Sequence, residues 1–318
     1  MEECEEKLPK RVVDVTKLYR TSTTRLLGGG KSGAYVFLVK GKRRNTILKY
    51  YPYSIGGAGG EYIGSRPLRD VLTSCALSGV TGFPELLRVF KTIPPVEWMV
   101  SAGVQEQDMR SLPAAGLATL SSVAPGTPLS DMEPEDLPPR VAIAIGFRLL
   151  KVLSDAEKRL GSFTHYDLHP GNIMIDKSKT VTTRIRGHTL VSPVLTLIDF
   201  DLAVTNFEGA AALIDAARTP NDRYAYFQKH LFVPLATLSF LYKMSNRSIL
   251  FSGEVLMYAL NFTHPDMQNW FVMMTALLGT ESSLAMCHNP EHCIDANLSL
   301  LEEVAEKKKN APRKRRVN

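Results

Sequence analysis

The polar loop from His165 to Asn172 constrains the fold of this chain more than any other segment. Its eight residues include histidine, aspartate, proline, glycine and asparagine, and the apolar run Ile173-Met174-Ile175 follows at once. Before the loop, apolar residues recur at helical spacing from Val141 to Leu160, and Gly161 is a typical helix stop. The sequence therefore predicts a long buried helix, a polar loop and a strand in succession, within a domain that contains both helices and sheet.

The N-terminal part of the chain has the pattern of strands joined by polar turns. Ala34–Val39 and Asn45–Tyr50 are rich in β-forming residues, and the basic stretch Gly41–Arg44 between them is typical of a hairpin turn. A helix is predicted over Leu68–Leu77, ending near Gly79. Further short strands are predicted around Glu85–Lys91, Glu97–Val100 and Leu117–Val123.

An acidic, proline-rich stretch from Ala124 to Pro139 separates the strand-rich part from the rest and is the best linker in the chain. We therefore expect a leader at residues 1–20, a small β-rich lobe at 21–124, a larger and mainly helical lobe at 125–303, and a basic tail at 304–318. Ligand pockets commonly form between two such lobes.

A glycine-rich motif lies between the first two predicted strands. Within Leu27–Tyr35, the residues Gly28, Gly30 and Gly33 have the spacing G-x-G-x-x-G, which lets backbone amides approach a phosphate closely. A Rossmann turn would need a helix next, where a strand is predicted, and a Walker loop would need glycine at the position of Arg25. A glycine hairpin without a ligand remains the competing interpretation.

Lys49 stands near the end of an apolar strand shortly after this motif. One interpretation is an ordinary lysine in water. The other is a phosphate-binding lysine, which needs an acidic partner from the following helix. Asp70 within the predicted helix and Glu61 just before it are the two candidates, and we favour Asp70.

A second apolar strand, Val194–Ile198, leads directly into Asp199. The aspartate is either a metal ligand or a simple strand-end cap. The segment that separates it from the polar loop is extended, and Val181–Arg186 and Thr189–Ile198 are predicted to pair as a hairpin around Gly187-His188.

These four motifs, in this order, resemble the eukaryotic-protein-kinase-like superfamily over residues 26–245. The loop departs from ordinary serine/threonine kinases, which have lysine at the position of His169, and is similar to the loops of haspin-type atypical kinases and aminoglycoside phosphotransferases. The extended segment before Asp199, Asp201 in place of glycine and the lack of an Ala-Pro-Glu signature favour the haspin type. Compact kinases of large DNA viruses are similar too, which leaves a cellular or a viral origin open.

The resemblance implies a bilobal α+β protein-kinase-like fold that binds ATP and Mg²⁺. It implies that Asp167 is the catalytic base, that Lys49 binds phosphate oxygens, and that Asn172 and Asp199 hold the metal. His169 would either stabilise the transferring phosphoryl group when protonated or bond to the backbone of its own loop. The cofactor-binding residues implied are Leu27, Gly28, Gly30, Gly33, Tyr35, Lys49, Asp70 and Asp199.

Three functions follow from the resemblance. The leading one is a serine/threonine protein kinase that acts on a protein substrate. A small-molecule kinase of the aminoglycoside-phosphotransferase type is the second, favoured by His169-Pro170-Gly171. A pseudokinase scaffold is the third, because Asp201 replaces glycine and the partner of Lys49 is uncertain from sequence.

Composition excludes other classes of protein. Apolar residues form 44% of the 318, which argues against global disorder. The net charge of +6 comes largely from Lys307–Arg316, so a basic nucleic-acid-binding face on the core is not implied. The tail could target the nucleus, contact nucleic acid or be a solvated end.

Four cysteines, no signal-peptide core and no apolar run of membrane length predict a soluble protein of a reducing compartment, in the nucleus or cytoplasm, without a membrane partner. Cys287, His288, His292 and Cys293 are zinc-type ligands. Four within seven residues can hardly surround one ion without a second segment, so zinc stays open.

Overall fold

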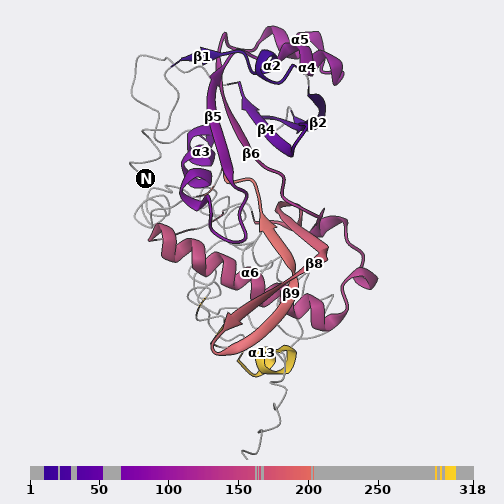
Figure 1. Ribbon diagram of the computed structural model, residues 1–318, viewed down its shortest axis with the longest axis vertical. Helices are drawn as coiled ribbons and strands as arrows, with labels where there is room; N and C mark the ends of the chain where they lie inside the picture. The colour runs from indigo at the N-terminus through magenta and orange to yellow at the C-terminus, as the bar shows by residue number, and fades with distance from the viewer. Residues whose placement is uncertain are drawn as a thin grey trace, which may run out of the picture.

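The chain folds as an α+β protein with a six-stranded mixed sheet and a three-stranded antiparallel sheet. Figure 1 shows the larger sheet in the upper half, and the smaller sheet below it with a long helix. This computed structural model describes residues 11–20, 22–29, 34–52, 66–161, 163, 165, 168–201, 203, 291, 294–295 and 298–305. The helical lobe predicted from sequence falls mostly outside these residues.

The six-stranded sheet has the order β1-β5-β6-β4-β3-β2, and its neighbours are antiparallel except for the parallel pair β1 and β5. Its strands are β1 (Val12–Val13), β2 (Thr23–Gly29), β3 (Tyr35–Lys40), β4 (Asn45–Tyr51), β5 (Leu86–Thr92) and β6 (Gly116–Ser122). The strands predicted for β3, β4, β5 and β6 are confirmed, with ends that differ by one residue at most.

The two faces of this sheet have different neighbours. Phe37 on β3 and Leu48 and Tyr50 on β4 are fully buried in a core that also contains Trp98 and Met99. Because side chains alternate along a strand, the residues between them point to the other face, toward the smaller sheet. That second face carries the candidate site.

Part of the expected leader belongs to the folded sheet. β1 adds to its edge, and the helix α2 (Val15–Leu18) follows directly. Asp14 caps this helix by accepting hydrogen bonds from the backbone N–H groups of Thr16 and Lys17, and Val15 is fully buried. Residues 12–18 therefore contribute to the core of the sheet.

The strand predicted at Glu97–Val100 is wrong, because this segment forms the helix α4 (Val96–Ser101). A short apolar run does not distinguish strand from helix by its periodicity. Here the helical turn places Trp98 and Met99 side by side on the sheet, and the Trp98 ring meets Phe37 edge-on at 5.6 Å between centroids. A further short helix, α5 (Glu106–Arg110), follows.

Two helices complete the described core. The predicted long helix is confirmed as α6 (Pro139–Leu160), and Gly161 ends it with φ 78°, a left-handed conformation that glycine adopts easily. The predicted helix before Gly79 is confirmed as α3 (Arg66–Leu77). Leu77 at the end of α3 packs in one cluster with Leu149 of α6, which joins the two parts of the protein.

The smaller sheet consists of β7 (Thr127–Pro128), β8 (Ile173–Ile185) and β9 (His188–Leu197), accompanied by the 3₁₀ turns η1 (Leu129–Asp131), η2 (Pro134–Asp136) and η3 (Pro170–Asn172). The predicted hairpin is confirmed, with its turn one residue earlier than expected. Arg186 and Gly187 both have positive φ, 47° and 81°, as a tight two-residue turn requires.

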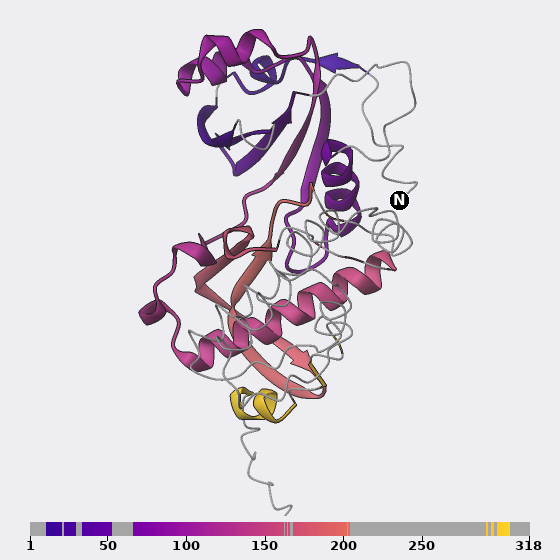
Figure 2. The ribbon, with the colours of Figure 1, turned by 180° about the vertical axis from the view of Figure 1, so that it is seen from behind.

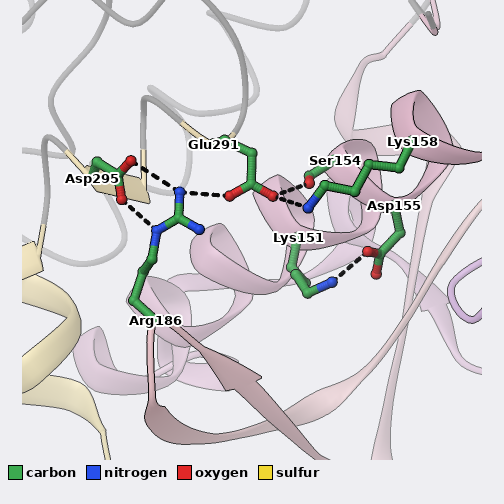
Figure 3. Close-up of polar contacts among 7 residues, drawn as sticks. All are labelled: Lys151, Ser154, Asp155, Lys158, Arg186, Glu291 and Asp295. Carbon is green, nitrogen blue, oxygen red and sulfur yellow. Dashed lines mark hydrogen bonds and ion pairs between the residues drawn. The ribbon is translucent and has the colours of Figure 1, made fainter. Parts of the chain in front are cut away.

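A polar cluster holds the tip of the β8–β9 hairpin, as Figure 3 shows. The Arg186 guanidinium lies 2.9 Å from Oδ2 of Asp295 and 2.7 Å from Oε2 of Glu291. Glu291 also accepts hydrogen bonds from Lys158 and Ser154 of α6, and these two donors hold its pKa down to about 2. The cluster thus joins the hairpin, α6 and the segment before α13 (Leu298–Val304).

Several sequence predictions concern residues outside the described part of the chain, and one differs from the structure. Glu61, the cysteine–histidine cluster and the basic tail lie outside the described residues. Cys75 in α3 is disulfide-bonded, whereas the expected reducing compartment disfavours disulfides. Among the helices that the structure describes, none is long and apolar enough to cross a membrane.

Candidate functional site

A cavity of about 540 Å³ lies between the six-stranded sheet and the base of the β8–β9 hairpin. Figure 2 shows from behind how α3 and this hairpin approach each other beneath the larger sheet. Apolar side chains from β2, β3, β4 and β8 line much of the cavity: Leu27, Val36, Leu38, Ile47 and Met174. This volume and this lining are typical of small-molecule sites.

Lys49 of β4 stands in the wall of this cavity between two carboxylates. Its Nζ lies 2.5 Å from Oδ1 of Asp199 and 3.5 Å from Oδ2 of Asp70. The lysine side chain is 14% exposed and that of Asp70 is 7% exposed. The predicted ion pair between Lys49 and Asp70 is therefore present, and Asp199 is a second partner that the sequence did not indicate.

The ammonium of Lys49 is stabilised by the carboxylates on its two sides. Burial by itself lowers the pKa of Lys49. Asp70 and Asp199 raise it by more than burial lowers it, so the pKa of Lys49 is above its ordinary value. Burial likewise raises the pKa of Asp199, and the ammonium of Lys49 outweighs this, leaving the pKa below its ordinary value. Lys49 and Asp199 are therefore both charged at neutral pH.

Asp70 links three parts of the site. Its Oδ2 accepts a hydrogen bond from the Tyr51 hydroxyl, and its Oδ1 accepts one from the Phe200 backbone N–H at 3.0 Å. A carboxylate on α3 thus contacts β4 and the segment after β9 together. These donors compensate the burial of its charge.

Tyr51 is a site residue that the sequence analysis missed. Its ring centroid lies 5.1 Å from Nζ of Lys49, a cation–π contact, and its hydroxyl contacts Asp70. Burial, followed by the negative charge of Asp70, raises its pKa well above the ordinary value. Its place two residues after Lys49 on the same strand face was a signal that could have identified it.

We expect Tyr51→Phe to lower the free energy of unfolding by about 2 kcal/mol, because a buried carboxylate loses a hydrogen-bond donor. Tyr50→Phe is the matched control: the Tyr50 hydroxyl is buried and has no hydrogen-bond partner among the described residues, so its removal should cost nothing. Urea unfolding of both variants measures the difference. Equal losses in the two variants would contradict the role of Tyr51.

Backbone pairing brings the polar loop and the end of β9 together. Ile173 pairs with Leu197 at the base of the hairpin, and Ile198 N–H donates to the carbonyl of Asn172 at 3.1 Å. His165, which is 3% exposed, places its Nε2 3.0 Å from the carbonyl of Ile198. Asn172 and Asp199 consequently line the same cavity.

Asp199 has an uncommon backbone conformation, with φ 68°. Aspartate tolerates this left-handed region better than most residues, whereas β-branched residues strongly disfavour it. The turn directs the carboxylate toward Lys49, while the next residue, Phe200, is buried against the rings of Phe83 and His165. Because the side chains of Asp199 and Phe200 point in opposite directions, the polar site is separated from the core.

The His169 side chain is hydrogen-bonded to the backbone of its own loop. Its Nδ1 accepts a hydrogen bond from the Gly171 N–H at 3.0 Å and so caps η3. The side chain is bonded to its own loop, as one of the two interpretations predicted. A role for His169 at the phosphoryl group stays a prediction.

The glycine-rich motif is only partly described. Leu27 lines the cavity, and the pairing of β2 with β3 shifts between Leu26 and Gly28. A side chain at Gly28 would meet no atom within 4 Å, so packing does not require glycine there. Gly30 and Gly33, like Asp167, lie outside the described residues.

Tyr35, one of the predicted cofactor-binding residues, lies apart from the candidate site. It packs with Phe37 in the core on the opposite face of the sheet and lines a different cavity, of about 720 Å³. Val36 and Leu38 face the candidate site instead. Side chains alternate along β3, so Tyr35 lies on the opposite face from Val36 and Leu38, and its role toward a cofactor stays a prediction.

The oxygen atoms of Asn172 and Asp199 are suitable ligands for Mg²⁺. Among the described residues there is no group of three or more His, Cys, Asp or Glu side chains that could hold a metal ion. Magnesium commonly takes only one or two protein ligands and completes its shell with phosphate oxygens and water. The two side chains on the cavity wall are compatible with such a site.

Comparison with protein-family models gives no match for this chain, and a search of curated proteins gives no match either. The function is therefore inferred from the residues of the cavity and from the motifs that supply them.

Proposed function

We propose that this chain is an ATP- and Mg²⁺-dependent protein kinase that transfers the γ-phosphoryl group of ATP to serine or threonine hydroxyls. The observation that carries the proposal is the position of Lys49 between Asp70 and Asp199, in the wall of a cavity that Asn172 also lines. The order of the four sequence motifs supports the same conclusion.

The cavity offers suitable partners for the two ends of ATP. The apolar side chains of Val36, Ile47 and Met174 would pack against the flat base, since they remove it from water. Lys49 would bind phosphate oxygens, and its raised pKa keeps it protonated for that purpose. Two carboxylates beside it hold the ammonium in place before the nucleotide arrives.

Asn172 and Asp199 would hold Mg²⁺, which when bound neutralises charge on the phosphates. Asp167 would accept the proton of the substrate hydroxyl, as the resemblance of its loop to the kinase catalytic loop implies. Positioning of the reactants and neutralisation of charge would supply most of the rate.

Incubation of the full chain with γ-labelled ATP, Mg²⁺, a protein mixture and a panel of small hydroxyl compounds tests the proposal. We expect label on serine or threonine residues of proteins. Label on a small compound alone would favour the small-molecule kinase, and nucleotide binding without any transfer would favour the scaffold. A chain that binds no nucleotide would overturn the proposal altogether.

A further inference from the structure

One end of the six-stranded sheet concentrates positive charge. The β3–β4 hairpin closes there: Lys40 pairs with Asn45, and the turn Gly41–Arg44 joins them. Six exposed basic side chains lie at this end of the sheet, on both of its faces, and we call them the basic end. They are Arg25, Lys40, Lys42, Arg43, Arg44 and Arg88.

Strand register and ring contacts bring these side chains together. Thr23 pairs with Lys40, so Arg25 lies two residues further along β2 on the same face as Lys40. On the other face, Arg88 lies over the Phe90 ring at 5.7 Å. Arg44 and Arg88 both approach Tyr19, where they oppose the burial that raises the pKa of this tyrosine.

The described structure provides little negative charge to balance the basic end. Arg44 lies 3.8 Å from Glu85, but both side chains are more than 60% exposed, with values of 62% and 61%. Such an exposed pair contributes little. Among the described residues, the other five basic side chains form no ion pair.

The net charge of the chain gives no indication of the basic end. Most of the net +6 resides in the tail, so the remainder of the chain is close to neutral. The sequence therefore indicated no basic face on the core, whereas the fold collects six cations at one end of one sheet. Concentrated like charges repel one another and attract anionic partners over a distance.

We propose that the basic end binds the phosphate backbone of duplex DNA. Four of its cations, Lys40, Lys42, Arg43 and Arg44, lie on or beside an exposed turn, which can contact phosphates without a concave pocket. Tyr19 packs against Phe90 and is half-buried, so it offers no platform for stacking unpaired bases. An acidic protein partner would be expected to meet apolar anchors, and the turn itself contains glycine, lysine and arginine only.

The basic end adjoins the candidate active site. Arg25 belongs to both, because it lines the cavity beside Leu27. A protein held on DNA through the hairpin would therefore carry its cavity close to the nucleic acid. Arg25 is unsuitable for a test because of this double position, whereas Lys42 and Arg43 in the turn are remote from the cavity wall.

The test measures binding of the full chain to a fluorescent DNA duplex by anisotropy, over roughly 50 to 200 mM salt. We expect the double variant Lys42→Gln/Arg43→Gln to weaken binding about tenfold and to lower the slope of log K against log salt by about 2, since two phosphate contacts are lost. The matched control, Lys179→Gln/Arg184→Gln, removes two exposed charges from β8 and should leave affinity and slope unchanged.

Two further binding measurements distinguish the basic end from the basic tail, and DNA from an acidic protein. Lys314→Gln/Arg315→Gln tests the tail, and binding that disappears in this variant while the hairpin variant binds as the wild type does would overturn the proposal. Poly-glutamate tests the acidic-protein alternative: a chain that binds poly-glutamate and not the duplex would also overturn it. The melting temperature of each variant shows whether the fold is retained.

Discussion

Lys49→Met should reduce phosphoryl transfer from ATP by about 10²- to 10³-fold, the typical effect of removing one electrostatic contact to the reacting group. The reason lies in the structure around Nζ. The ammonium lies 2.5 Å from Asp199 and 3.5 Å from Asp70, and methionine retains the bulk of the side chain without the charge. Two carboxylates would then face the phosphates without an intervening cation.

The same variant should lose stability, because the buried Asp70 carboxyl group would lose one of its partners. Breaking a buried ion pair by removing one side costs about 3 kcal/mol. Lys179→Met, on the exposed part of β8, is the matched control for both measurements. Steady-state kinetics and urea unfolding provide the readouts, and a Lys49→Met enzyme with wild-type turnover would exclude the proposed phosphate-binding role.

Asp167→Ala should reduce phosphoryl transfer by about 10³-fold, within the usual range for loss of a general base, and leave nucleotide binding intact. Asp167 lies outside the described residues. Its neighbours in the loop, His165 and Leu168, are buried.

The control for this prediction is Asp131→Ala, which removes an exposed carboxylate from η1. We expect its turnover and nucleotide affinity to equal those of the wild type. The readouts are turnover with labelled ATP and nucleotide affinity by calorimetry. Loss of nucleotide binding together with turnover in Asp167→Ala would indicate a structural role for the residue and not a catalytic one.

Local signals were sufficient for several elements of the fold. The apolar spacing from Val141 to Leu160 and the glycine after it predicted α6, because periodicity and a left-handed stop are properties of neighbouring residues. The glycine at position 187 predicted the β8–β9 turn for the same reason. The run Glu97–Val100 had neither a clear periodicity nor a glycine stop. Here the packing of Trp98 on the sheet favours a helix.

The candidate site was predictable in part. Lys49, Asp70, Asn172 and Asp199 could be named from motifs, and the ion pair of Lys49 with Asp70 was expected. The contact of Lys49 with Asp199 joins residues 150 positions apart in the sequence, and no periodicity indicates it. Tyr35 was named from the same motifs and lies on the opposite face of the sheet from Val36 and Leu38, since a motif carries no information on which side of a sheet a residue points.

Residue types and their short-range spacing thus specify the helices, most of the strands and the chemical groups available for function. The pairing of distant strands decides which of these groups come together: Asp70 with Tyr51 and Lys49, or six scattered cations at one end of one sheet. These contacts depend on sheet register and on burial. Both arise only in the folded chain, which excludes water and must satisfy its buried charges.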